Sequence, residues 1–509
     1  MATYYFDAST GSNTTGDGSI GNPWQYYEGK YTSIVAGDRL LFKRGTTQLI
    51  TTIYIPLISG NSSTQTYYGV YGSGTGKVTW AGQNVWGSLL NGSKKSYVTL
   101  EDFDFDGSNQ TSGTIYFAGQ DTGSVSNIII RRCRFFGVKD NGVGLLFTKE
   151  STSTTAEVKD CLIEDCDFFN NGAHGTIVIG CSNITYKRCR AWNNGKTATA
   201  GGHGFSARAV RNTVTSGWTL VSGTTYSRTL SATETDVYYI NSTSSYLRLT
   251  KNTSTPTTPS AGQFGVSTGT LYVNAGVDAN TISITYAYVN CSNILFEDCE
   301  AFNNIWNPGS TYHEGHGIAL DDFTQNSTIR KCFSHDNQGL GLSNNGGDGN
   351  LIESNIVTRN WESGVTTNYA NNVVIRNNTF YNNNYYNPVF HTGEIRFSAF
   401  CNSCTVTNNY LEAGLSGNIY GIDINPVNSG FTISNNNIVG YTTPVKSVSA
   451  INTTSYSNQL SKYFTLISSS PLIAGGNYIQ QIQDKNFSTF QNPPSIGAYE
   501  YIRPRTFRS

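Results

Sequence analysis

Charged residues are scarce in this sequence. Lys and Arg total 33, Asp and Glu total 34, and together they make up only 13% of 509 residues, with a formal net charge of -1. A chain without a basic excess has no electrostatic field to hold nucleic acid, and one without an acidic tail has none for a basic partner. We therefore expect no nucleic-acid partner.

Long apolar runs are missing as well. No stretch approaches the ~20 apolar residues of a membrane span, and the start, MATYYFDAST, lacks the basic and apolar regions of a signal peptide. We expect a protein without a membrane span that is extracellular or associated with a virus particle. The sequence also has a single Met and 12 Pro against 53 Gly and 32 Tyr, which is typical of an all-β protein with many turns.

One phrase recurs along the chain with a period of about 23 residues. It reads NIIIRRCRFFG from Asn127, NITYKRCRAWNN from Asn183 and NILFEDCEAFNN from Asn293, with more divergent copies up to TISNNNIVGY from Thr432. When the copies are aligned, one position is filled in turn by Phe103, Cys133, Cys166, Cys189, Cys299, Cys332, Asn355, Asn378, Asn409 and Asn436.

This repeat predicts a parallel β-helix. A leucine-rich repeat would show a Leu lattice and a helical half, whereas this chain shows β-branched strands and Asn or Gly corners. In a β-helix, like residues of successive coils form internal ladders, and five Cys followed by four Asn are such a ladder. Cys181, Cys291 and Cys401 fit a second rung, which also explains the CxxC of Cys401 and Cys404. We predict reduced, buried cysteines rather than disulfides or a metal site.

The ladder jumps between Cys189 and Cys299, and the excess locates an insertion. Residues 213–288 carry no copy of the phrase and read as alternating strands joined by Gly, Ser, Thr and Pro turns. We predict an N-terminal cap with the first coils over 1–212, an inserted β module over 213–288, the remaining coils over 289–460, and a closing segment over 461–509.

The two ends of the chain resemble a known superfamily. The opening YYFDASTGSNTTGDGSIGNPW, the following AGDRLLFKRGTT and the closing NPPSIGAYEY are similar to the entrance and exit of right-handed β-helix proteins of the pectate-lyase-like superfamily. The resemblance implies an all-β, right-handed parallel β-helix that acts on polysaccharide as a lyase, hydrolase, epimerase or phage tailspike depolymerase. A tailspike-like protein would also be a homotrimer. Fold alone does not choose among these activities.

The candidate catalytic residues lie in STYHEGHGIALDD, from Ser310. If Ile318 and Leu320 point inward from a strand, Asp321 points outward and Asp322 begins the next turn. Paired carboxyl groups are what glycoside hydrolysis requires, although aspartates also end strands and cap turns. GHGIALDD resembles polygalacturonase-like hydrolases, where an Asp pair and a Gly-His-Gly serve the site, but there the two motifs lie on different coils. Glu314 or Asp348 could replace one aspartate.

Residues around this pair are candidates for holding substrate. His174, His203 and His316 each precede a Gly at a strand entrance, so on adjacent coils they would form a column, with Arg208 beside Asp321. This column is either catalytic or a packing ladder. Aromatic rings at corners can stack on sugars or shield the helix edge. The candidates of this kind are Trp306, Tyr312 and Trp361.

No cofactor or metal is expected. HEGH lacks the spacing of the zinc helix motif. Binding of Ca²⁺ is left as an alternative, although no specific motif indicates it. The expected function is endo-type hydrolysis of an extracellular bacterial or algal polysaccharide, with His316 and His203 orienting it. Two alternatives remain: β-elimination by a lyase on a uronic-acid polymer, in which a cation neutralises the uronate, and a non-catalytic glycan-binding virion or structural protein.

Overall fold

A computed structural model of the chain describes residues 1–83, 87–150, 155–197, 201–230, 239–242, 247–307, 314–384, 386, 393–414, 420–446, 453–455, 466, 469–473 and 495–498. Over these residues the regular structure is β-strand, apart from two short 3₁₀ turns, η1 (Tyr31–Ser33) and η2 (Ala279–Thr281). Nowhere in this part of the chain is there a helix long and apolar enough to cross a membrane. The chain divides into two interleaved units, 1–294 with 304–315 and 321–324, and 295–303 with 316–320 and 325–509.

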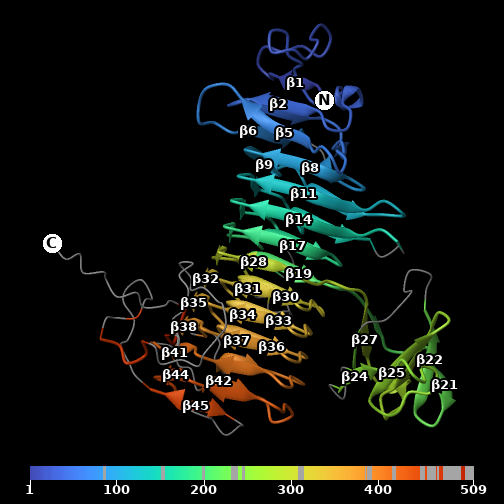
Figure 1. Cartoon of the computed structure of the whole chain (residues 1–509), viewed down its shortest axis with the longest axis vertical. Coiled ribbons are helices and arrows are strands. Elements are labelled where there is room, and N and C mark those ends of the chain that lie inside the picture. Colours follow the sequence, from blue (N-terminus) through green and yellow to red (C-terminus); the bar gives the residue numbers. More distant parts are fainter. Residues whose placement is uncertain are drawn as a thin grey trace. The chain divides into compact units, whose positions relative to one another are not determined.

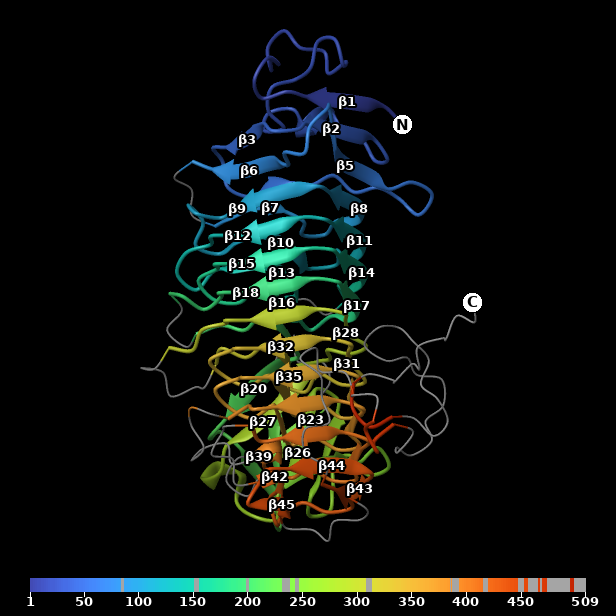
Figure 2. The same ribbon diagram turned by 90° about the vertical axis from the view of Figure 1, so that its left-hand side faces the viewer.

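The first unit consists of three parallel sheets in which each coil adds one strand to every sheet (Figures 1 and 2). The first sheet contains β1 (Thr3–Phe6), β2 (Arg39–Lys43), β5 (Thr66–Tyr71), β8 (Ser96–Glu101), β11 (Val125–Arg131), β14 (Val158–Glu164) and β17 (Ser182–Lys187). The second contains β4 (Ile55–Pro56), β7 (Ser88–Asn91), β10 (Gly113–Gly119), β13 (Val143–Lys149), β16 (Thr176–Ile179) and β19 (Phe205–Arg208). The third contains β3 (Thr47–Ile50), β6 (Val78–Gly82), β9 (Phe103–Asp106), β12 (Arg134–Phe136), β15 (Asp167–Phe169) and β18 (Arg190–Trp192). This architecture is the predicted parallel β-helix.

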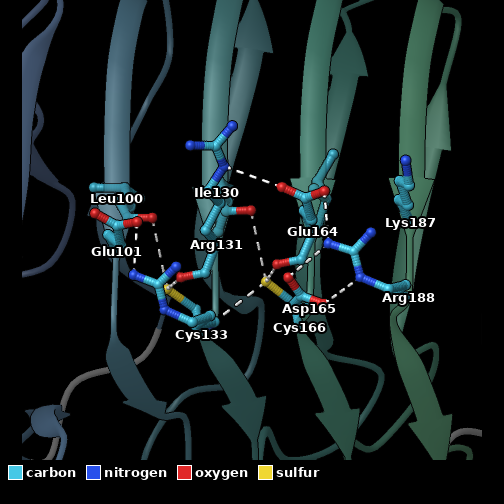
Figure 3. A network of polar contacts seen from close by, with 12 residues as sticks. Leu100, Glu101, Ile130, Arg131, Cys133, Glu164, Asp165, Cys166, Lys187 and Arg188 are labelled. Carbon is cyan, nitrogen blue, oxygen red and sulfur yellow. Dashed lines mark hydrogen bonds and ion pairs between the residues drawn. The ribbon is translucent and has the colours of Figure 1, made fainter.

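The cysteine ladder forms as predicted. All ten cysteines are free and buried. The backbone N–H of Cys133 donates to the Cys166 Sγ at 3.4 Å, and the Cys166 thiol donates to the Ile130 carbonyl at 3.7 Å (Figure 3). Outside the ladder, Glu164 accepts from Arg131 at 3.2 Å and from Arg188 at 2.7 Å, so ion pairs join successive coils on the surface. The repeat is thus held inside by stacked like residues and outside by alternating charges.

The inserted segment forms a sheet of its own. In sheet order its strands are β20 (Val210–Val214), β27 (Ile284–Val289), β23 (Tyr239–Ser242), β24 (Leu247–Lys251), β25 (Gln263–Ser267), β26 (Thr270–Asn274), β22 (Thr225–Thr229) and β21 (Thr219–Ser222). The strands pair antiparallel except for β24 with β25, and they enclose a separate apolar cluster around Trp218, Phe264 and Leu271. Whether the module can be removed from the rest stays a prediction.

The second unit repeats the three-sheet pattern. The first sheet contains β28 (Leu295–Glu297), β31 (Thr328–Arg330), β34 (Leu351–Glu353), β37 (Val374–Arg376), β40 (Thr405–Thr407) and β43 (Thr432–Ser434). The second contains β30 (Ile318–Asp321), β33 (Leu342–Asn345), β36 (Val365–Asn368), β39 (Gly393–Phe397), β42 (Tyr420–Ile424) and β45 (Thr443–Lys446). The third contains β29 (Glu300–Phe302), β32 (Phe333–His335), β35 (Ile356–Thr358), β38 (Thr379–Tyr381), β41 (Tyr410–Glu412), β44 (Asn436–Val439) and β46 (Thr453–Thr454).

In the second unit the predicted ladder continues in asparagine. Asn355 Nδ2 donates to Asn378 Oδ1 at 2.9 Å, Asn378 to Asn409 at 3.0 Å, and Asn409 to Asn436 at 2.9 Å. A further ladder runs from Asn337 to Asn360 at 2.9 Å and from Asn360 to Asn383 at 2.8 Å. Each amide therefore both donates and accepts, as a buried polar group requires.

The second asparagine ladder ends on a carboxyl group. Glu394, which is fully buried, takes the hydrogen bond of the Asn383 Nδ2 and one from the Tyr441 hydroxyl at 3.1 Å. Burial raises the pKa of Glu394 to about 7, and the two hydrogen bonds only partly oppose that rise. Glu394 thus terminates the ladder as a carboxyl group that is partly protonated near neutral pH.

Candidate functional site

A pocket of about 340 Å³ opens on the outer face of the second sheet of the first unit. Leu146 and Ile177 pair across β13 and β16 and form its apolar floor, while Ile179 pairs with Arg208 at the end of β19. His174 and Arg208 supply its polar wall, and we call this space the histidine pocket. It combines an apolar surface with a cation and an imidazole.

Beside this pocket, two carboxylates meet one imidazole nitrogen. The Nε2 of the buried His203 lies 2.5 Å from Glu314 Oε2 and 3.6 Å from Asp321 Oδ2. Burial alone would lower the pKa of His203, but the charge and hydrogen bond of Glu314, together with the charge of Asp321, outweigh it and raise that pKa. The imidazole therefore bridges the two acids, whose charges favour its protonated form.

His174 is held in one tautomer. Its Nδ1 accepts a hydrogen bond from the backbone N–H of His203 at 3.0 Å, and the two rings lie 4.9 Å apart. Burial, then the charge of His203, lowers the pKa of His174 to about 3, so the ring is neutral. A neutral imidazole that accepts at Nδ1 carries its proton on Nε2. His174 is therefore a hydrogen-bond donor at Nε2.

Asp322 does not share His203 with Asp321, because it pairs with Arg211 instead. Its Oδ1 lies 2.9 Å from the Nε of Arg211 on β20, and its backbone carbonyl accepts from the N–H of Ala209 at 3.0 Å. Asp322 also has a positive φ of 44°. These contacts are those of a residue that ends a strand and fixes a turn, whereas Asp321 and Glu314 share His203.

Two more predicted residues of the first unit can be located. Arg208 is half-buried, lines the histidine pocket and is near enough for its charge to oppose protonation of both His174 and His203. Trp306 is half-buried and forms a bridge with Gly201. A Cβ on Gly315 (φ +87°) would lie 2.7 Å from the Trp306 backbone N, so only glycine allows this close approach.

The remaining predicted residues belong elsewhere. In the second unit, the buried His316 accepts the Leu340 N–H at its Nδ1 at 3.0 Å. Asp348 links successive coils, since its Oδ1 accepts from the N–H of Asn371, 23 residues later, at 2.7 Å. Trp361 stacks on the exposed Tyr386 with ring centroids 4.3 Å apart. Tyr312 lies outside the described residues.

The described part of the chain contains no group of three or more His, Cys, Asp or Glu side chains that could hold a metal ion. Acidic residues at the site instead pair with His203 and Arg211.

Sequence reasoning missed several residues of this face. Arg211 lies three residues after Arg208. It contacts Asp322 only because the chain comes back to this coil after the inserted residues. A second pocket of about 450 Å³ shares Ser112 and Leu146 with the histidine pocket and is lined by Tyr54, Tyr116 and Glu150 among others. Tyr116 could have been found as an outward residue of an alternating strand; Tyr54 and Glu150 carry no sequence signal.

Comparisons with known proteins agree with this fold. Residues 287–438 match the family model described as a right handed beta helix region. Among solved structures, the A-module of the Azotobacter vinelandii mannuronan C-5 epimerase AlgE4 is 13% identical over 84% of this chain and 93% of its own, with a TM-score of 0.51. XylC in complex with xylose is 10% identical over 98% of each chain, with a TM-score of 0.53. Pectate lyase Pel9A is 14% identical over 98% of this chain and 96% of its own, with a TM-score of 0.49.

A comparison with curated proteins finds no significant match. At these identities the likeness is one of fold. The chain is a right-handed parallel β-helix, as the repeat and the resemblance to pectate-lyase-like proteins predicted.

Proposed function

We propose that this protein is an enzyme that cleaves an extracellular polysaccharide by glycoside hydrolysis, with Glu314 and Asp321 as its two carboxyl groups. The observation that carries the proposal is that both groups surround one nitrogen of His203. Similar folds occur in an epimerase of mannuronan and in a protein solved with xylose. These similarities support a polysaccharide as the substrate.

The distances favour one stereochemical course. Because both oxygens are measured to the same nitrogen, at 2.5 Å and 3.6 Å, they are at most about 6 Å apart. Retaining glycosidases hold their carboxyl groups about 5–5.5 Å apart, while inverting enzymes need about 6.5–9.5 Å to admit water between them. We therefore propose retention through a covalent glycosyl intermediate.

The roles of the two acids follow from their contacts. Glu314 is closer to the His203 imidazole, and a nearby cation favours the ionised carboxylate. Glu314 is accordingly the nucleophile, and Asp321 protonates the leaving oxygen and then takes the proton of the incoming water. His203 keeps both side chains in place.

Elimination by a lyase is the second candidate, supported by Arg208 at the histidine pocket, where it would neutralise a uronate. A lyase also needs a base. His174 lines the same pocket as Arg208, but its Nε2 carries the proton and so donates rather than accepts. This tautomer supports hydrolysis over elimination.

The test is to screen bacterial and algal polysaccharides for new reducing ends and to record the ultraviolet absorbance of unsaturated products. Hydrolysis gives reducing ends without that absorbance, and elimination gives both. On a confirmed substrate, Asp321→Asn should lose roughly two to four orders of magnitude in turnover. Asp322→Asn should lose no more than about tenfold, since Asp322 acts through Arg211. Equal loss in both variants, or in neither, would contradict the assignment.

A further inference from the structure

A second pocket on this face, next to the histidine pocket, is a built polar site. Its volume is about 450 Å³, and we call it the distal pocket. The polar and aromatic side chains that line it are Tyr54, Asn91, Ser93, Tyr116, Gln120 and Glu150. It lies outside the group of Glu314, His203 and Asp321, so the proposed chemistry does not use it.

The carboxylate of the distal pocket is fixed in position. Glu150 Oε1 accepts from the Tyr116 hydroxyl at 2.8 Å and from the Gln120 Nε2. Burial, followed by the hydrogen bond to Glu150, raises the pKa of Tyr116 well above its usual range, so its hydroxyl remains a donor. Two donors thus orient one oxygen of Glu150, and within the described residues no group donates to the other oxygen, which can accept from a sugar hydroxyl.

An aromatic ring stands beside this carboxylate. Tyr54 is 37% exposed, and its backbone has a positive φ of 58°, which is costly for a residue of this size. Its ring lies over Gly87, where an added Cβ would come within 3.3 Å of the tyrosine ring. An exposed ring on a rigid support, next to a carboxylate and amides, offers the apolar face and the acceptors that a sugar ring uses.

The charge of the distal pocket selects among sugars. Glu150 is the one charged side chain among the described residues that line it. A uronate or sulfate group there would face a carboxylate without a cation to offset it, which is unfavourable at short range. The ligand that fits is an uncharged sugar.

The distal pocket is also continuous with the proposed site. It shares Ser112 and Leu146 with the histidine pocket. Outward residues pair from coil to coil, as Asn91 with Tyr116, Tyr116 with Leu146, Leu146 with Ile177, and Ile177 with Ser206. These four steps at the usual strand spacing span about 19 Å, enough for several sugar units of one chain.

We infer that the distal pocket is a subsite for an uncharged sugar unit of the polysaccharide, several units away from the bond that is cleaved. This rests on the proposed function for the polysaccharide, but not on its mechanism. The substrate is then neutral at this unit, whatever groups it carries elsewhere.

Calorimetric titration of the full chain tests the inference without any turnover. The chain carries Asp321→Asn to preserve the probes, which are hexasaccharides of xylose, glucose, mannose and galactose, and hexamannuronate as the anionic comparison. We expect at least one neutral hexasaccharide to bind more tightly than hexamannuronate. Tyr54→Asn, which tolerates the positive φ, and Glu150→Gln should each weaken that binding about tenfold or more.

Glu157→Gln is the matched control, because Glu157 is an exposed carboxylate on the same unit outside the pocket. It should bind as the parent does. Failure of every neutral hexasaccharide to bind, tighter binding of hexamannuronate, or unchanged affinity in both pocket variants would overturn the inference. The hydrolysis proposal fails separately, by its products, so the two failures can be told apart.

Discussion

Replacing Glu394 by glutamine should stabilise the protein at neutral and alkaline pH. The pKa of this buried carboxyl is raised from 4.5 to about 7 in the folded chain. A shift of that size corresponds to about 3 kcal/mol. Below pH 4.5 the group is protonated in both states and costs nothing. Between pH 4.5 and 7 the unfolded chain ionises this group while the folded chain keeps it protonated, so stability falls progressively, and the loss is complete above about pH 7.

Glutamine avoids this loss and retains the contacts. Its amide oxygen can accept from Asn383, and its NH₂ can donate to the Tyr441 hydroxyl, the two partners that Glu394 has now. Unfolding entropy is about 2.1 cal/mol/K per residue. For a chain of 509 residues that melts as one unit, 3 kcal/mol corresponds to a rise of about 3 °C in Tm at pH 8, and a larger rise if the second unit melts alone.

The assay is differential scanning calorimetry of parent and Glu394→Gln at pH 4.5 and pH 8. The difference between the two proteins isolates Glu394, because other buried acids such as Glu362, whose pKa burial raises to about 8, change equally in both. Glu157→Gln serves as the exposed control. A difference in Tm that is the same at both pH values would refute the reasoning, since Glu394 would then not be protonated by burial.

Three other predictions concern the site, the cysteines and the module. Turnover should fall on the alkaline side of the pH–rate profile, because deprotonation of His203, whose pKa the two carboxylates raise, removes the cationic bridge; a profile without such a fall would contradict it. Thiol titration should find few reactive cysteines before unfolding and about ten after it, as burial raises the pKa of Cys161 to about 12. A Gly/Ser loop in place of 213–288 should leave a β-rich protein that melts cooperatively, and loss of folding would count against an inserted module.

The fold could be predicted because inward positions repeat. A residue inside a β-helix contacts its equivalents on the coils before and after, so selection for packing makes those equivalents alike. The Cys133 to Cys189 ladder and its continuation from Asn355 to Asn436 could be aligned on this basis, and the structure has them in that register. The register also holds where cysteine changes to asparagine, because the backbone N–H of Cys332 donates to the side-chain Oδ1 of Asn355 at 2.9 Å.

The site was predicted only in part because outward positions do not repeat. Asp321 and His203 were found from a local cluster of acids and histidines, and their proximity follows from the coil alignment. Glu314 was found only as a possible replacement for one aspartate, because the sequence shows that Asp322 begins a turn but not where that turn directs its carboxylate. The positive φ of Asp322 is that turn, and it directs the carboxylate to Arg211.

Arg211 also connects the inserted sheet to this coil. It belongs to β20, where it pairs with Ala287 of β27, so the first and last strands of the module hold it in place. Its guanidinium forms an ion pair with Asp322, whereas Asp321 and Glu314 both contact His203. In a regular coil the residue after Arg208 would turn directly into the next sheet, and no cation would be fixed at this position. The inserted sheet therefore contributes to the site through its base, by separating two neighbouring aspartates that would otherwise compete for one imidazole.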